Sequence, residues 1–289
     1  MIYLLLCILS STAIVIVFKL LERFKVNTFA AIATNYIFAA SLGFLLNNNT
    51  VSFQSVINSN WLGLAFVIGL LFILMFWLMG KTIKYAGVSV STVAGRMSVI
   101  LPITFSIVYD NEVLETTKLV GIILAVLAVV LTVYKKPDAK VNRNAIIFPI
   151  IIFFGLGAVD TFVKYAQSNY VSDNYASVFS GVLFTISCVS GLIIVMLSKK
   201  LRNEFFRLKT LLLGGLLGIA NFGSIYFILL ALNSGSLDGS VIFGVNNIGI
   251  VVLAVFSAYL FFNEKLSKIN YFGIFLSVAA ALLLMFESF

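Results

Sequence analysis

Long apolar runs alternate with short polar segments from one end of the chain to the other. The runs are about 20 residues long, the length that an α-helix needs to cross ~30 Å of hydrocarbon, whereas strands of a membrane β-barrel are shorter and alternate in polarity. The pattern therefore predicts an all-α integral membrane protein. Ten transmembrane helices are expected: Ile2–Leu20, Thr28–Leu46, Trp61–Met79, Gly87–Tyr109, Thr117–Tyr134, Ala145–Tyr165, Tyr175–Leu197, Leu211–Leu232, Gly239–Phe262 and Ile269–Phe286.

One stretch of sequence occurs twice, the second copy 152 positions after the first. We therefore expect two related five-helix halves, residues 1–137 and 138–289, that together form one membrane domain. Because five is odd, the second half enters the membrane in the opposite sense, which makes the halves an inverted repeat. The matched residues are expected to be structural: Asn111, Glu112 and Gly121 in the first copy, and Asn263, Glu264 and Gly273 in the second.

Small residues four positions apart predict places where two helices approach closely. Spans 5 and 10 carry such pairs and no internal charge, so we expect them to be structural helices. The pairs are Gly121 with Ala125, Gly273 with Ser277, Gly214 with Gly218, and Ser187 with Gly191.

The composition restricts the function. Hydrophobic residues make up 61% of the chain and charged residues 10%, against about a half and a quarter in soluble domains. The net charge of +8 resides in short segments between spans and forms no continuous face, so nucleic acid is not expected as a partner. The chain has no histidine, which removes histidine acid–base chemistry and histidine-ligated zinc and haem. We therefore expect that the protein is not an enzyme and that it binds no cofactor.

The distribution of the 19 lysines and arginines predicts the orientation. Sixteen follow spans 1, 3, 5, 7 and 9, only Lys118 and Lys164 fall on the other side, and Arg96 lies inside a span. The positive-inside rule then places those five segments in the cytoplasm and both termini outside. A bacterial plasma (inner) membrane is the expected location, and the partners expected are the bilayer, with anionic lipids at the basic cytoplasmic segments, and a small-molecule substrate.

Arg96 is the leading candidate for a substrate-binding residue. If its span began after it, only the 13 residues Met97–Tyr109 would remain, which form about 20 Å of helix and cannot cross the bilayer. Burying this cation costs at least ~2.5–3.5 kcal/mol, so it should face a watery cavity or a partner. It can bind a carboxylate or phosphate by forked hydrogen bonds, or its side chain snorkels to the interface. Pro102 cannot donate to the Ser98 carbonyl and is expected to kink the same helix.

Asp160 is the acidic residue that lies well inside an apolar run. It is expected either to pair with Lys164 one turn later, or to pair with Arg96 until protonation or substrate breaks that pair. Further polar residues inside spans are candidates for substrate contacts, with hydrogen bonding between helices as the alternative: Asn246, Asn247, Asn35, Asn221, Tyr226, Ser10 and Ser11. Glu112 and Glu264 are expected to cap helices or to bond loops.

Asn-Glu-x-Leu turns close the fourth span of each half, at Asn111–Leu114 and Asn263–Leu266, and a glycine opens each fifth span. This pattern resembles the drug/metabolite transporter superfamily, EamA type. The resemblance implies a basket-like helical fold with a central cavity between the halves, and export or exchange of small metabolites such as amino acids, sugars or nucleotide derivatives. It also implies both termini in the cytoplasm, opposite to the charge count. The small multidrug relatives use a glutamate in their first span, and span 1 here has no acid.

The function expected is secondary active transport, by export or exchange, of a small anionic or zwitterionic metabolite through alternating access between the repeats. An alternative is a proton-coupled cation or drug exporter that uses Asp160. From a different class, a channel or lipid scramblase is the other alternative. The phosphate-binding loop G-x-x-x-x-G-K-[ST] does not occur, so direct use of ATP is not expected.

Overall fold

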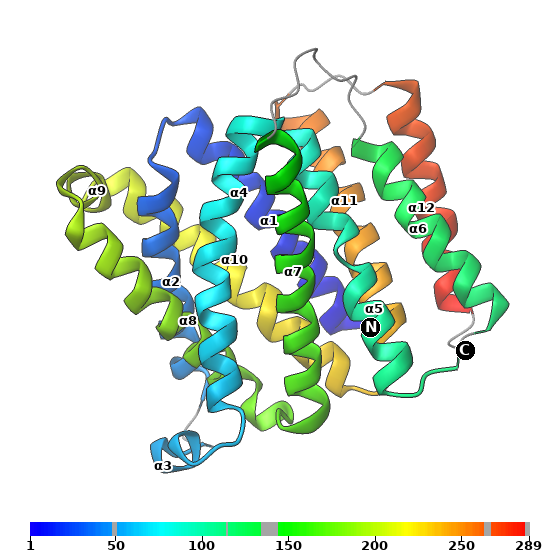
Figure 1. The fold of residues 1–289 in the computed structure, drawn as a ribbon, viewed down its shortest axis with the longest axis horizontal. Coiled ribbons are helices and arrows are strands. Elements are labelled where there is room, and N and C mark those ends of the chain that lie inside the picture. Colours follow the sequence, from blue (N-terminus) through cyan, green and yellow to red (C-terminus); the bar gives the residue numbers. More distant parts are fainter. Residues whose placement is uncertain (48–50, 114, 134–143, 263–266, 287–289) are drawn as a thin grey trace. The chain divides into compact units, whose positions relative to one another are not determined.

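A computed structural model describes residues 1–47, 51–113, 115–133, 144–262 and 267–286, and within these ranges it is helical and contains no strand. Its helices are labelled in Figure 1. Their bounds are α1 Ile2–Arg23, α2 Thr28–Leu45, α3 Phe53–Ile57, α4 Leu62–Met97, α5 Ile100–Tyr109, α6 Thr116–Val133, α7 Asn144–Asn169, α8 Asp173–Leu197, α9 Lys199–Phe205, α10 Leu208–Asn233, α11 Gly239–Phe262 and α12 Lys268–Phe286.

Hydropathy predicted most of these helices closely. The expected span Thr28–Leu46 is α2, which ends at Leu45, and Gly239–Phe262 has the same bounds as α11. Among the described residues, six helices are long and apolar enough to cross a membrane, and four shorter apolar helices accompany them. Two short helices, α3 and α9, lie in segments that were expected to be loops.

Helix α4 differs from the prediction, which separated span 3 from span 4 by a polar segment between Met79 and Gly87. The backbone is helical from Leu62 to Met97 without interruption. The physical reason is that the segment 80–86, Gly-Lys-Thr-Ile-Lys-Tyr-Ala, contains one glycine and no proline. Polarity sets where a chain meets water, but lysine, threonine, tyrosine and alanine are all tolerated within a helix.

The helix is interrupted later, at Ser98 and Val99, inside the predicted span Gly87–Tyr109. Pro102 has no N–H to donate to the Ser98 carbonyl, which accepts instead from the Leu101 N–H at 3.0 Å. The chain then resumes as α5 with Pro102 in its first turn, where a missing N–H has no cost. Arg96 therefore lies in the last turn of α4, next to this break.

The chain packs as two compact units, whose boundaries fall inside α4 and α7. Unit 1 consists of Met1–Trp77 and Tyr165–Asn233, and unit 2 of Leu78–Lys164 and Ser234–Phe289. Each unit thus contains helices from both of the halves predicted from the sequence.

Unit 1 is built around α2, which packs against α8 and α10. Small residues allow close approach, as their spacing predicted: a Cβ on Gly214 would lie 2.9 Å from the Ala31 carbonyl oxygen, and one on Gly218 would lie 2.5 Å from that of Asn35. Buried Tyr36 adds an aromatic contact to Phe184 across this packing, with ring centroids 6.1 Å apart. Contact between helices in unit 1 thus depends on the absence of side chains at these glycines.

Unit 2 places α6 and α12 side by side (Figure 1), and α11 packs against α5, α6 and α12. Gly121 on α6 and Gly273 on α12 are both buried. On α7, a Cβ on Gly157 would lie 2.9 Å from the Ser98 carbonyl oxygen. This glycine therefore lets α7 approach the break between α4 and α5.

The glycine contacts predict a difference between two identical substitutions. Gly218→Ala should destabilise the protein by about 1–3 kcal/mol, because the new methyl group overlaps the backbone of α2. Gly63→Ala, in α4, meets nothing within 4 Å and should be neutral or stabilising by up to about 1 kcal/mol. Denaturant titration of both variants in detergent micelles measures the difference, and equal unfolding free energies would contradict the packing described for unit 1.

Candidate functional site

Arg96 lies where α4 ends and where α11 approaches it, within unit 2. The Arg96 carbonyl oxygen accepts a long bond from the Val99 N–H (3.4 Å) and a short one from the Asn247 side-chain amide (2.9 Å). A carbonyl at a helix end is available to such a second donor. Asn247 corresponds to Gly95 by the 152-residue offset, so it bonds the residue that follows its own matching position. Asn247, itself a candidate for substrate contact, thereby holds the backbone of Arg96 in place.

Helix α7 brings the carboxylate of Asp160 to the same region of unit 2. Gly95 has no side chain, and Leu156 of α7 lies where one would be, 3.2 Å from an added Cβ. Asp160 follows Leu156 by one turn on α7, and its carboxylate attracts the Arg96 guanidinium electrostatically. Arg96, Asn247 and Asp160 are therefore brought together from three helices.

Asn246, beside Asn247, has a buried side-chain oxygen without a hydrogen-bond partner in the described part of the chain. A buried polar atom of this kind costs free energy unless water or a ligand satisfies it. The region thus combines a cation and a carboxylate, and the residue next to Asn247 has an unsatisfied amide oxygen. In the ranges that the structure describes, no group of three or more histidine, cysteine, aspartate or glutamate side chains could hold a metal ion.

The other five candidates for substrate contacts lie in unit 1: Asn35, Asn221, Tyr226, Ser10 and Ser11. The Asn221 side chain donates to the Asn35 side-chain oxygen at 3.1 Å, and both residues are buried. Tyr226 stacks on Phe222, with ring centroids 5.2 Å apart. Within unit 1 the two asparagines connect α2 with α10, which is the helix-bonding role given as the alternative to substrate contact.

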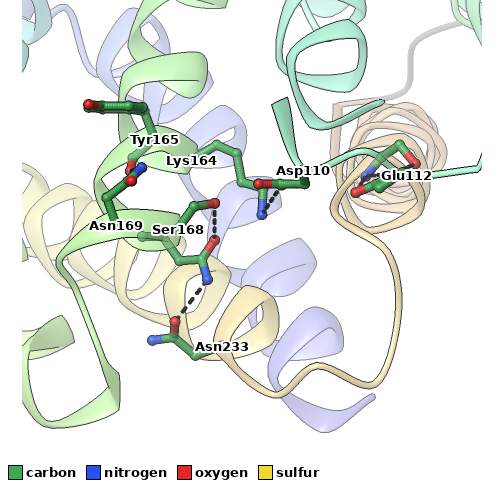
Figure 2. Close-up of polar contacts among 9 residues, drawn as sticks. Asp110, Glu112, Lys164, Tyr165, Ser168, Asn169 and Asn233 are labelled. Carbon is green, nitrogen blue, oxygen red and sulfur yellow. Dashed lines mark hydrogen bonds and ion pairs between the residues drawn. The ribbon is translucent and has the colours of Figure 1, made fainter. Parts of the chain in front are cut away.

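Lys164 forms an ion pair with Asp110, a partner that the sequence analysis did not name. Its ammonium lies 2.8 Å from the Asp110 carboxylate, and the two side chains are only 8% and 23% exposed. Figure 2 shows Lys164 extending from α7 toward Asp110 at the end of α5. Sequence reasoning missed Asp110, although it directly precedes the repeated Asn-Glu turn, because a residue outside the spans was not considered as a partner.

The Asn-Glu turn itself ends α5 and caps α11. Asn111 has a left-handed backbone (φ 53°), which asparagine tolerates better than most residues. The Glu112 carboxylate accepts from the backbone N–H of Ser240 (3.3 Å to each oxygen) and from the Ser240 hydroxyl. A carboxylate is favourable at this position because the first N–H groups of a helix are unpaired and carry partial positive charge. The matching residues Asn263 and Glu264 lie outside the described residues.

Gly239 lets these groups come together at the start of α11. A Cβ at this position would lie 2.8 Å from the Ser106 hydroxyl oxygen and 2.9 Å from the Lys164 side chain. The buried Ser106 hydroxyl has no hydrogen-bond partner among the described residues. A larger residue at position 239 would therefore require the Ser106 and Lys164 side chains to move aside.

A second polar contact shown in Figure 2 belongs to unit 1. The Gln167 amide donates to the Asn233 side-chain oxygen at 3.0 Å, and the Asn233 amide donates to the Val171 carbonyl at 3.1 Å. The end of α7 is thereby joined to the end of α10.

Comparison with known proteins agrees with the resemblance seen in the repeated turns. Residues 1–134 match the EamA-like transporter family, whose members are membrane transporters and not enzymes. An uncharacterised protein of Haemophilus influenzae is 28% identical over 279 residues, which cover 94% of each chain. A protein of known crystal structure is similar in fold, with a TM-score of 0.78 at 13% identity over 99% of this chain and 96% of that one.

The cap on α11 predicts coupled effects on stability. Ser240→Ala and Glu112→Ala should each destabilise the protein by about 1–3 kcal/mol, because a bond to a charged group is lost. The double variant should cost less than the sum of the two, because the same interaction is removed twice. Ser41→Ala is the control, since that exposed hydroxyl bonds only to its own helix. Additive losses in unfolding free energy would contradict the bond between the Ser240 hydroxyl and the Glu112 carboxylate.

Proposed function

We propose that this EamA-like membrane protein is a secondary active transporter that exports or exchanges a small anionic or zwitterionic metabolite. The observation that carries the proposal is the position of Arg96 in unit 2, half-buried at a helix end and near Asp160 and Asn247. A guanidinium presents two parallel N–H groups that match a carboxylate or phosphate. The unsatisfied oxygen of Asn246 offers an acceptor for a donor group on the substrate.

The proposal includes ten spans in two inverted repeats, residues 1–137 and 138–289. By the 152-residue offset, α2 corresponds to α8, α5 to α11 and α6 to α12, and the members of each pair pack against each other. Contacts between equivalent helices are what a two-fold relation between the repeats produces. Such a relation supports alternating access, because two equivalent halves can exchange conformations.

Two hydrogen bonds in unit 1 support the same relation. One joins the Asn221 amide to the Asn35 side-chain oxygen at 3.1 Å, and the other joins the Ser187 hydroxyl to the Gly69 carbonyl at 2.8 Å. Subtracting 152 from 187 and 221 gives 35 and 69, so the two bonds join equivalent pairs of positions. Different side chains thus make the same connection in each half.

Charge exchange within unit 2 offers a way to couple substrate binding to movement. Arg96 attracts Asp160, while Lys164 pairs with Asp110. Asp160 and Lys164 are four residues apart on α7, a spacing at which helical side chains interact. A substrate anion that occupies Arg96 frees Asp160 to attract Lys164, which weakens the contact of Lys164 with Asp110 at the end of α5.

The orientation we propose follows the charge count, with both termini outside and the basic segments in the cytoplasm of a bacterial plasma membrane. A reporter that is active only in the cytoplasm, fused after Phe289, should therefore be inactive. The same reporter placed after Arg207, between α8 and α10, should be active. The reverse result would establish the orientation that the family resemblance implies.

Flux measurements in proteoliposomes test the role of Arg96. A panel of carboxylates, phosphates and uncharged metabolites should include an anionic or zwitterionic compound with saturable, counterflow-stimulated uptake. Arg96→Gln should weaken its apparent affinity about 10–100-fold, since a bond to a charged group contributes about 1.5–3 kcal/mol. Arg96→Lys should be intermediate, because it keeps the charge and loses the planar fork. Arg207→Gln, which removes an exposed arginine of unit 1, is the control.

The same assay separates the alternatives. Equal flux of the anion in Arg96→Gln would remove this residue from the site. A cationic substrate whose proton-coupled flux loses its pH dependence in Asp160→Asn would favour the exporter that uses Asp160. Conductance that does not saturate would favour a channel.

A further inference from the structure

The helices before and after α9 in the chain determine where α9 lies relative to the membrane. It lies between α8, which ends at Leu197, and α10, which begins at Leu208, and both are long and apolar enough to cross a membrane. Only residues 198–207 connect the two. A connection this short cannot leave the membrane surface, so α9 lies at the boundary between lipid headgroups and water.

The segment is strongly basic, and its cations are exposed. The one acidic residue in the stretch, Glu204, is bound by Arg207, with the guanidinium nitrogen 3.0 Å from the carboxylate oxygen. The basic side chains project from the helix and from the turn after it: Lys199, Lys200, Arg202, Arg207 and Lys209. The stretch therefore presents a net positive charge of four at the membrane surface.

A buried phenylalanine fixes the side of α9 that faces the protein. Phe205 is 6% exposed and packs with Ala30 and Ala33 of α2 and with Val195 of α8. The Ser198 side chain accepts from the Leu201 N–H and begins the helix. The cations of α9 are thus held on a defined surface of unit 1.

Large apolar side chains are exposed next to these cations. Leu197, Phe206 and Leu208 are 83%, 64% and 70% exposed. Beside a lipid headgroup, such side chains insert into the boundary with the acyl chains, while lysine and arginine bind the phosphates. Anionic lipids satisfy both parts of this surface at once, because they supply a phosphate of net negative charge and an acyl chain.

We propose that α9 and its flanking residues form a binding site for anionic phospholipids. The headgroup phosphate is held by Lys199, Lys200 and Arg202, and Phe206 inserts beside the acyl chains. An orientation signal requires only the charge. The buried anchor and the exposed aromatic ring are additional features, and they are what a lipid site requires.

Fluorescence quenching by brominated lipids tests the site directly. The protein has two tryptophans, so Phe206→Trp is introduced into a Trp61→Phe, Trp77→Phe background, which leaves a single indole on α9. The protein is reconstituted into bilayers of phosphatidylcholine and phosphatidylglycerol at a fixed ratio, with either one or the other lipid brominated. Stronger quenching by brominated phosphatidylglycerol than by brominated phosphatidylcholine is expected, and the difference should fall in 1 M salt, where the screening length is about 3 Å instead of about 10 Å at 0.1 M.

Removing the cations should abolish the preference. Lys199→Gln, Lys200→Gln and Arg202→Gln together should eliminate the selective quenching, since each cation near the surface contributes about fivefold to the association. Lys19→Gln, Arg23→Gln and Lys25→Gln remove the same charge from the end of α1 and the turn before α2, and should leave most of the preference. Equal losses in both sets would mean that overall surface charge, and not α9, attracts the lipid, and would overturn the proposal.

Two further outcomes would also overturn it. Equal quenching by both lipids in the unmodified segment would exclude a preference for anionic lipid. Little quenching by either lipid, with the emission of a water-exposed indole, would place position 206 in water and leave the surface to a soluble acidic partner. None of these measurements depends on transport, so they are independent of the function proposed above.

Discussion

A polar group in the hydrocarbon core of a membrane has no water to bond, so it must find its partner inside the protein. This constraint accounts for the hydrogen bonds that join the helices. Asn221 bonds Asn35, Ser187 bonds the Gly69 carbonyl, and the Asn247 amide bonds the Arg96 carbonyl. Bonds of this kind contribute about 1–2 kcal/mol at most, so close packing at glycines must supply the rest of the contact between helices.

By the same constraint, a buried polar atom that has no partner in the described part of the chain is a candidate for binding water or a ligand. The side-chain oxygen of Asn246 is one of them, and it lies beside Asn247, which bonds Arg96. The hydroxyl of Tyr36 is another, enclosed by the rings of Phe76 and Phe184. Of these two atoms, the Asn246 oxygen belongs to the residue next to Asn247, which bonds Arg96, a cation that can bind an anionic metabolite. This supports the proposal that the substrate binds at Arg96.

The residues that occur in both copies of the repeated sequence differ from Arg96, which occurs in one copy only. The first Asn-Glu turn is structural, since Asn111 reverses the backbone and Glu112 caps α11. Arg96 has Ile248 at its matching position, and Ile248 is buried. In unit 2 Arg96 and Lys164 each lie near an aspartate, Asp160 and Asp110, so an anion bound at Arg96 under the proposed function would compete with one of the protein's own carboxylates.

The sequence by itself predicted most of the helices, because the length and polarity of a span follow from the thickness of the bilayer, but not that α4 continues from Leu62 to Met97. It also predicted the close contacts at Gly214 and Gly218, and the interruption near Pro102, from local chemistry. Only the tertiary structure decided which groups are partners. Lys164 bonds Asp110, and Glu112 caps α11 at Ser240, 128 residues away in the chain. These choices depend on how α5, α7 and α11 pack, and the spacing of residues along one helix carries no information about the helix that lies beside it.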